Sequence, residues 1–196
     1  CVHNAIDDVR RCLATVERTA YPSFKLILVD DGSDPETAAF LREVAGARDN
    51  VLLIRRDEAA GYTVAANTGI RESSSDIVVL LNSDTITSAS WLTKLVRVFA
   101  QKPDVGLVGP LSNAASWQSI PERSSPSGQW VVNELPTDMG IDEMDALVEA
   151  TSRAIPVIPR VPLLNGFCYA IRREVIDTIG AFDEASFPRG FGEEDD

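Results

Sequence analysis

Short apolar runs alternate with helix-like segments through the first 110 residues, and this alternation limits the possible folds more than any other feature. Apolar runs of strand length lie at residues 24–29, 51–54, 77–81 and 105–108. Helices are predicted at residues 7–19, 34–44, 62–72 and 90–100. They are indicated by helical spacing of apolar residues or, at Asp34-Pro35, by a helix start. Strands that alternate with helices form right-handed βαβ units. The sequence therefore predicts an α/β fold with a mostly parallel central sheet flanked by helices.

The second half of the chain departs from this pattern. Residues 112–140 are rich in Ser, Pro, Asn and Gly, and a loop of this length inside a domain is usually functional. Beyond it, apolar spacing predicts a helix over 141–155, a strand over 167–171 and a helix over 172–179 that Gly180 ends. We therefore expect one long loop followed by a distinct C-terminal part of the same domain.

Charge and residue counts exclude several classes of function. The net charge is −12, whereas nucleic acid is bound mainly through Lys and Arg, so we expect no nucleic-acid partner. The single histidine, His3, excludes a histidine-rich zinc site, and no serine lies in a nucleophile-elbow pattern. Three cysteines provide no disulfide framework, and no apolar run reaches the roughly 18 residues that span a bilayer. Any chemistry must therefore use carboxylates, amides, hydroxyls or a hard metal ion.

Polar residues stand where the expected strands end. They are His3-Asn4, Asp30-Asp31-Gly32-Ser33, Asn82-Ser83-Asp84-Thr85 and, before the late strand, Asn165-Gly166. In open α/β sheets, ligands bind beyond the carboxyl ends of the strands. A carboxylate such as Asp84 at a buried strand end needs a partner, and Mg²⁺ or Mn²⁺ together with phosphate oxygens would be suitable. The alternatives are structural, with Asp84 capping the next helix and Asp30 or Asp31 serving as turn residues.

Taken together, these segments resemble the family 2 glycosyltransferases, which have the GT-A fold. The similarity lies in residues 28–33 (family V-D-D-G-S), 61–70 (G-F-x-x-A-x-N-x-G-I), 80–85 (L-L-N-x-D-T, a form of the D-x-D metal motif), 164–167, 170–174, 180–184 and 190–196 (the E-D region). Two positions depart from the family pattern. Ala59 stands where the family often has Asn, and Asn82 replaces the first Asp of D-x-D.

The resemblance implies roles for individual residues. Asp84 would hold a divalent cation, Mn²⁺ or Mg²⁺, which offsets the charge that develops on the leaving diphosphate. Asp31 would accept a hydrogen bond from the nucleotide base. The other residues expected around the nucleotide-sugar are Val2, His3, Asp30, Gly61, Asn67, Asn82 and Ser83, with His3 as a packing or stacking residue and Asn67 and Gly61 shaping the site.

The acceptor side and the catalytic base are assigned to the C-terminal part. Asn165 and Gly166 would line the acceptor side. Aligning the last aspartate of the E-D-x-D pattern with the end of the chain makes Glu194 the base, and Glu193 and Asp195 remain alternatives. Trp117 and Trp130 could stack on a sugar or could pin the long loop to the core.

The implied reaction is inverting transfer of a sugar from a nucleoside-diphosphate sugar to a glycan or lipid-linked acceptor, in cell-surface polysaccharide synthesis. We expect residues 1–196 to be one domain cut from a longer protein at both ends, with residues 1–111 binding the donor and 112–196 facing the acceptor. The expected location is the cytoplasm or, through peripheral attachment, the inner face of the membrane. A non-catalytic nucleotide-sugar-binding module, a nucleotidyltransferase and a phosphohydrolase are the alternatives.

Overall fold

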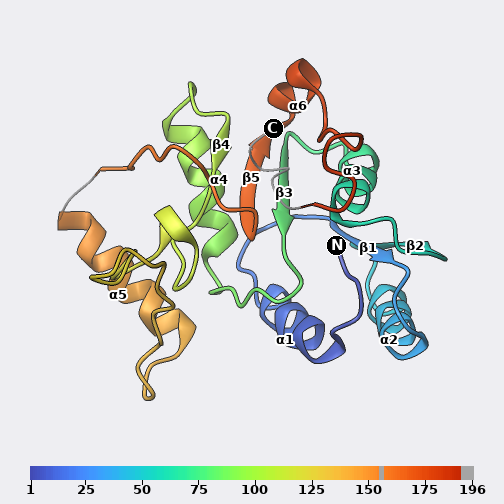
Figure 1. Cartoon of the computed structure of the whole chain (residues 1–196), viewed down its shortest axis with the longest axis horizontal. Helices are drawn as coiled ribbons and strands as arrows, with labels where there is room; N and C mark the ends of the chain where they lie inside the picture. Colours follow the sequence, from blue (N-terminus) through green and yellow to red (C-terminus); the bar gives the residue numbers. More distant parts are fainter. Residues whose placement is uncertain (155–156, 191–196) are drawn as a thin grey trace.

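The computed structural model describes residues 1–154 and 157–190, and its elements follow the expected order closely (Figure 1). The elements are α1 (Ile6–Val16), β1 (Leu26–Asp31), α2 (Pro35–Gly46), β2 (Val51–Arg56), α3 (Tyr62–Glu72), β3 (Ile77–Leu81), α4 (Trp91–Gln101), β4 (Leu107–Val108), the 3₁₀ turn η1 (Ser116–Gln118), α5 (Ile141–Ala154), β5 (Cys168–Arg172) and α6 (Arg173–Ile179). The predicted α/β class with a parallel sheet is confirmed.

Strand pairing divides the sheet into two parts. β1 and β2 pair in parallel, and Val2 forms a parallel bridge to Asp30. β5 lies between β3 and β4 and runs antiparallel to both, so this three-stranded part pairs antiparallel, whereas the β1–β2 part pairs in parallel. The direction of β5 follows from its connection, since β5 is joined to β4 through the long loop and α5. Although α5 lies in this connection, the long irregular loop before it lets the chain enter β5 from the opposite end, so the connection is not a βαβ crossover.

The core is built on both faces of β1 and on both faces of β3. Val9 and Leu13 of α1 pack with Leu28 of β1 and Leu41 of α2 in one buried cluster. A second cluster joins α3 and β3 to Tyr169 and Ile171 of β5. Asp34 starts α2 as predicted, because its carboxylate accepts a hydrogen bond from the Thr37 amide at 2.8 Å. Packing on both sides holds the ends of β1 and β3 in place, and those ends carry the polar loops.

Charged contacts attach α5 to the rest of the domain. Lys94 on α4 contacts the carboxylates of Asp145 at 2.7 Å and Glu149 at 2.9 Å. Asp145 also accepts a hydrogen bond from the Ser90 hydroxyl, and Asp142 accepts one from the Ala89 amide. Among the α5 side chains that the structure describes, those of residues 141–153, none is in the buried core, and Leu147 is half exposed. The attachment of α5 therefore depends on these ionised groups more than on apolar burial.

We expect α5 to detach in acid. Burial alone would raise the pKa of Asp145, but hydrogen bonds from Lys94 and Ser90 outweigh it and hold that pKa below its ordinary value. A depressed pKa gives stabilisation that is complete above the unfolded value of about 3.9 and lost as pH falls through the folded value. Hydrogen exchange of α5 amides, corrected for intrinsic rates, should therefore accelerate below about pH 4.

At neutral pH, Lys94→Ala should lower the free energy of local opening of α5 by about 1–3 kcal/mol, because it removes the partner of Asp145 and Glu149. The matched control is Arg153→Ala, which removes an exposed ion pair to Glu149 within α5 itself and should cost under about 0.5 kcal/mol. Equal protection of α5 in the wild type and in Lys94→Ala would show that the charged contacts do not hold the helix.

Candidate active site

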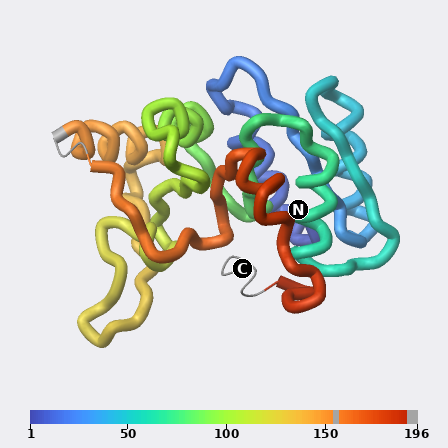
Figure 2. Tube along the Cα trace, turned by 90° about the horizontal axis from the view of Figure 1, so that it is seen from above, coloured from blue at the N-terminus to red at the C-terminus, as the bar shows by residue number. Residues whose placement is uncertain are grey.

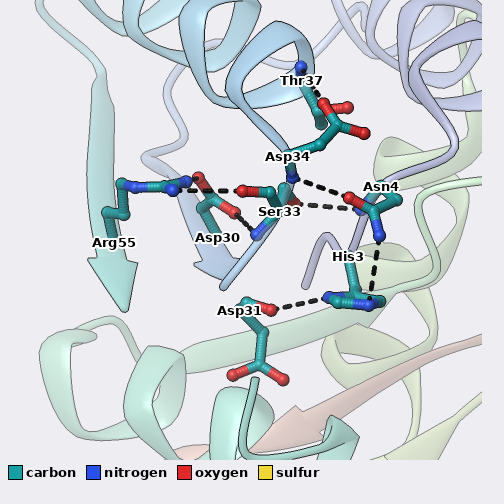
Figure 3. A network of polar contacts seen from close by, with 8 residues as sticks. All are labelled: His3, Asn4, Asp30, Asp31, Ser33, Asp34, Thr37 and Arg55. Atoms are coloured by element: carbon teal, nitrogen blue, oxygen red, sulfur yellow. Dashed lines mark hydrogen bonds and ion pairs between the residues drawn. The ribbon is translucent and has the colours of Figure 1, made fainter. Parts of the chain in front are cut away.

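Asp30 is a fully buried carboxylate at the end of β1, and its partners all come from the protein. It is 0% exposed, accepts a hydrogen bond from the Ser33 amide at 2.9 Å and forms an ion pair with Arg55 of β2. Arg55 also donates to the Ser33 carbonyl at 3.1 Å (Figure 3). In the sheet register Asp30 stands opposite Arg55. Through these contacts Asp30 shapes the turn at Gly32-Ser33. This is the structural role that the sequence left open as an alternative for Asp30.

Asp31 points the other way and reaches the start of α3. Figure 3 shows its carboxylate directed away from the Asp30–Arg55 pair. The carboxylate accepts hydrogen bonds from the Ala60 amide at 2.9 Å and the Gly61 amide at 2.8 Å, and Arg56 lies 3.4 Å away. A negative charge is stabilised at a helix N-terminus by the exposed amides and the helix dipole. A carboxylate has about four acceptor positions, so Asp31 can still accept a further donor from a ligand.

His3 and Asn4 fasten the first residues of the chain to the loop after β1. The His3 Nδ1 donates to the Asp31 carbonyl at 2.7 Å, which leaves Nε2 to accept from the Asn4 side-chain amide at 3.2 Å. The Asn4 side-chain oxygen accepts a hydrogen bond from the Asp34 backbone amide at 2.7 Å, and the Asn4 backbone amide donates one to the Ser33 hydroxyl at 3.0 Å (Figure 3). The His3 ring is exposed. The network presents this ring beside Asp31, in a position that suits stacking.

Helix α1 contacts the loop after β3 and begins next to the loop after β1. The Cys12 thiol of α1 lies 3.6 Å from the Asn82 carbonyl, while α1 begins directly after the His3-Asn4 contacts to the loop after β1. Ser83 and Val2 also line one cavity of about 470 Å³ between β1 and β3. Burial raises the pKa of Cys12 to about 11, so the thiol stays protonated and no thiolate competes with oxygen ligands here. The loops after β1 and β3 therefore lie on the same side of the sheet.

Asp84 differs from both aspartates of β1. It is exposed on the turn after β3, and its carboxylate forms no hydrogen bond or ion pair with residues 1–154 or 157–190. A cation held by protein groups alone would need several ligands, and the described residues contain no cluster of three or more His, Cys, Asp or Glu. Mg²⁺ and Mn²⁺ use one or two carboxylates and complete their shell with phosphate oxygens and water. Asp84 thus fits a cation that arrives with a diphosphate.

Gly61 and Asn67 are contact points between α3 and the C-terminal segment. At Gly61 the φ angle is +100°, and a Cβ there would lie 2.6 Å from the Pro188 carbonyl oxygen, so only glycine allows this approach. The Asn67 amide is buried and bonds to the Phe182 backbone and to Glu184 at 2.9 Å. The Asn67 and Arg71 hydrogen bonds lower the pKa of Glu184, which keeps it ionised. Asn67, expected near the nucleotide, thus faces the segment that leads toward the terminal acidic residues.

Asn165 is positioned by a residue that the sequence did not single out. Its amide donates to the Gln118 side-chain oxygen at 2.6 Å, and the Gln118 nitrogen donates to the Pro110 carbonyl at 2.7 Å. Gln118 is 4% exposed, and it ties η1 to the stretch that contains Asn165 and Gly166. A lone glutamine in a polar loop gives no sequence signal of such a role.

The sequence also missed Arg55 and Arg56. A signal for them existed, because two adjacent arginines end β2 just as two adjacent aspartates end β1, and parallel neighbours in register bring the pairs together.

Glu193 and Glu194, expected as alternatives for the base, lie outside the described residues. Cys1, Cys12 and Cys168 are free thiols. In the described part of the chain, no helix has both the length and the apolar character to cross a bilayer.

An α/β domain whose polar loops gather at one side of the strands defines a ligand-binding domain of the GT-A kind. The comparisons agree. The mannosyltransferase PcManGT from Pyrobaculum calidifontis, solved in complex with GDP-Man and Mn²⁺, has a TM-score of 0.66 at 22% identity, over 99% of this chain and 47% of that one. The model described as "Glycosyl transferase family 2" matches residues 1–180, and the chain belongs to this family.

Two relatives illustrate the range of the family. Glycosyltransferase AglE of Haloferax volcanii is 33% identical over 110 residues, which cover 55% of this chain and 36% of AglE. The O-antigen biosynthesis protein RfbC of Myxococcus xanthus is 28% identical over 176 residues, which cover 85% of this chain and 13% of RfbC. The chain thus spans about a third or less of the length of these relatives.

Proposed function

We propose that this chain is the donor-binding and catalytic domain of an inverting, metal-dependent glycosyltransferase. It would transfer a sugar from a nucleoside-diphosphate sugar to a hydroxyl of a glycan or lipid-linked acceptor in cell-surface polysaccharide synthesis. The observation that carries the proposal is the contrast among three strand-end aspartates. Asp30 and Asp31 are bound by protein groups, whereas Asp84 forms no such contact with the described residues. PcManGT with GDP-Man and Mn²⁺, and the role of RfbC, support the donor, metal and pathway classes.

The donor site would be assembled from the loops after β1 and β3. Asp31 would accept the N–H of the base, because it has acceptor capacity left after binding the Ala60 and Gly61 amides. The exposed His3 ring, oriented by its bond to the Asp31 carbonyl, would stack beside the base. Val2, Asn82 and Ser83 would frame the rest of the nucleotide-sugar, and Asp30 would act only by shaping the turn. When bound, a divalent cation on Asp84 would supply Lewis-acid stabilisation of the diphosphate.

Transfer would then need a base near the anomeric carbon. We assign this role to Glu194, with Glu193 as the alternative. The acceptor hydroxyl attacks the anomeric carbon and gives its proton to the base, while the bond from that carbon to the diphosphate oxygen breaks. A positioned base contributes roughly 10²–10⁴-fold to the rate. Residues 187–190 support this placement, because Thr63 binds the Phe187 carbonyl and Gly61 contacts Pro188 beside Asp31.

Donor binding tests the proposal directly. Thermal unfolding should be followed with UDP-, GDP- and dTDP-sugars, each with and without Mn²⁺. We expect one nucleotide class to raise Tm by about 5–10 °C at 100 times its Kd, and to do so only with the metal. Mn²⁺ alone should leave Tm nearly unchanged, since Asp84 has no companion ligands in the described part of the chain. The proposal fails if no nucleotide-sugar shifts Tm, or if Mn²⁺ alone does so as strongly as the mixture.

A further inference from the structure

The loop after η1 contains a preformed hairpin, which we call the Trp hairpin (residues 122–133). Ser124 and Trp130 form an antiparallel bridge, and the turn between them is closed by the Ser125 amide to the Gln129 carbonyl at 2.8 Å. At the base, the Asn133 side chain donates to the carbonyls of Asn113 at 3.0 Å and Glu122 at 2.8 Å. These bonds give the hairpin a defined shape even though it projects from the domain.

Two tryptophans and one arginine gather on this hairpin and on η1. The ring centroids of Trp117 and Trp130 are 6.0 Å apart at 67°, an edge-to-face arrangement. The Arg123 guanidinium lies over the Trp117 ring, 5.3 Å from its centroid. Trp117 is 41% exposed and Trp130 is 59% exposed, so neither ring pins the loop to the core. Paired aromatic surface left open to solvent, with a cation beside it, is typical of a binding site.

The aromatic pair is connected to the acceptor-side segment. Trp117 immediately precedes Gln118, a buried residue whose side-chain oxygen accepts a hydrogen bond from the Asn165 backbone amide at 2.6 Å. In both overall views the loop of residues 112–140, in yellow, lies at the opposite end of the long axis from residues 35–46 and 51–56 (Figures 1 and 2). The pair is therefore on the acceptor half of the chain and far from the loop after β1. A ligand in contact with both regions would have to be extended.

The chemistry of this surface favours a carbohydrate. Sugar rings have apolar C–H faces bordered by hydroxyls, and flat aromatic rings bury such faces well. The hairpin adds hydroxyl and amide groups that can bond to sugar hydroxyls, from Ser124, Ser125, Ser127 and Gln129. An anionic lipid surface fits less well, because residues 112–140 contain three carboxylates and one guanidinium, Arg123, and no lysine.

We propose that Trp117, Trp130 and Arg123 form a subsite for a glycan acceptor, which holds sugar units several positions away from the reacting hydroxyl. The inference rests on the proposed function and narrows its acceptor to a saccharide chain. It predicts that loss of the Trp130 ring weakens the binding of saccharide chains.

The test is calorimetric titration of the whole chain with neutral hexasaccharides of N-acetylglucosamine, mannose and galactose, and with an acidic hexasaccharide containing glucuronic acid. We expect at least one hexasaccharide to bind, and Trp130→Ala to weaken it by about tenfold or more. Trp130→Phe, which keeps an aromatic face, should stay within about threefold of the wild type. The matched control is Val132→Ala, on the same hairpin and 67% exposed, and should change binding less than about twofold.

Several results would overturn the inference. These are binding of no hexasaccharide in the panel, equal affinity in Trp130→Ala, or loss in Trp130→Ala of binding to phosphatidylglycerol vesicles instead of to sugars. The nucleotide-sugar shift in Tm separates this inference from the proposed function. If Trp130→Ala keeps that shift and its hexasaccharide affinity, only the subsite is wrong. If the wild type binds hexasaccharides through Trp130 but no nucleotide-sugar, the subsite stands and the donor assignment falls.

Discussion

Asp84→Asn is expected to abolish metal-dependent sugar transfer while leaving the domain folded. The substitution removes the one strand-end carboxylate that has no hydrogen-bond or ion-pair partner among the described residues, and with it the charge that would hold a cation beside the diphosphate. Loss of about 4 kcal/mol of such stabilisation corresponds to roughly a 10³-fold fall in kcat. Because the side chain is exposed, the free energy of unfolding should change by no more than about 0.5 kcal/mol. Donor turnover with Mn²⁺ and urea unfolding would measure the two effects separately.

Asp76→Asn is the matched control. Asp76 directly precedes β3, whereas Asp84 follows it, so the same change of charge is made at the other end of the strand. Turnover in Asp76→Asn should stay near that of the wild type. Full activity in Asp84→Asn, or equal losses in the two variants, would show that Asp84 does not hold the metal.

The terminal acidic residues provide the contrasting result. Glu194→Gln should keep the nucleotide-sugar shift in Tm and lose transfer by about 10²–10⁴-fold, because only proton removal is affected. Should Glu193→Gln show this behaviour instead, the base is Glu193 and the register of the E-D pattern is shifted by one residue.

The second large effect concerns stability. Arg55→Met leaves the Asp30 carboxylate fully buried with the Ser33 amide as its remaining partner in the described structure. Removing one member of a buried ion pair costs about 3–5 kcal/mol, and the partial exposure of Arg55 puts the expected cost near the lower end. A loss of this size is a large share of the roughly 5–15 kcal/mol that stabilises a typical domain. Urea denaturation at pH 7 would measure it.

A double-mutant cycle makes this prediction specific. Asp30→Asn combined with Arg55→Met removes the uncompensated charge, so the double variant should be more stable than Arg55→Met alone. The matched single control is Arg56→Met, where Asp31 keeps the Ala60 and Gly61 amides, and we expect a cost of about 1 kcal/mol or less. If Arg55→Met costs no more than Arg56→Met, then the buried pair does not stabilise the turn after β1.

Local patterns predicted most of the elements. Helix α3 and strand β3 have the expected bounds, and Asp34-Pro35 starts α2 as expected. These features depend on neighbours in sequence, through apolar spacing and helix capping. β5 was also placed within one residue at each end, but its direction could not be predicted. That direction depends on how the chain returns from the long loop and α5, and no periodic signal within the strand records it.

The sequence by itself determined the order of strands and helices, the position of polar loops at the strand ends and, through its motifs, the family. Apart from the roles that the family resemblance implied, it gave no physical ground for distinguishing the aspartates at 30, 31 and 84, because all follow apolar runs in similar local surroundings. The tertiary structure separated them. Arg55 and the Ala60 and Gly61 amides, more than 20 residues away, bind Asp30 and Asp31. A carboxylate's function depends on which distant groups satisfy its charge, and only folding brings those groups within reach.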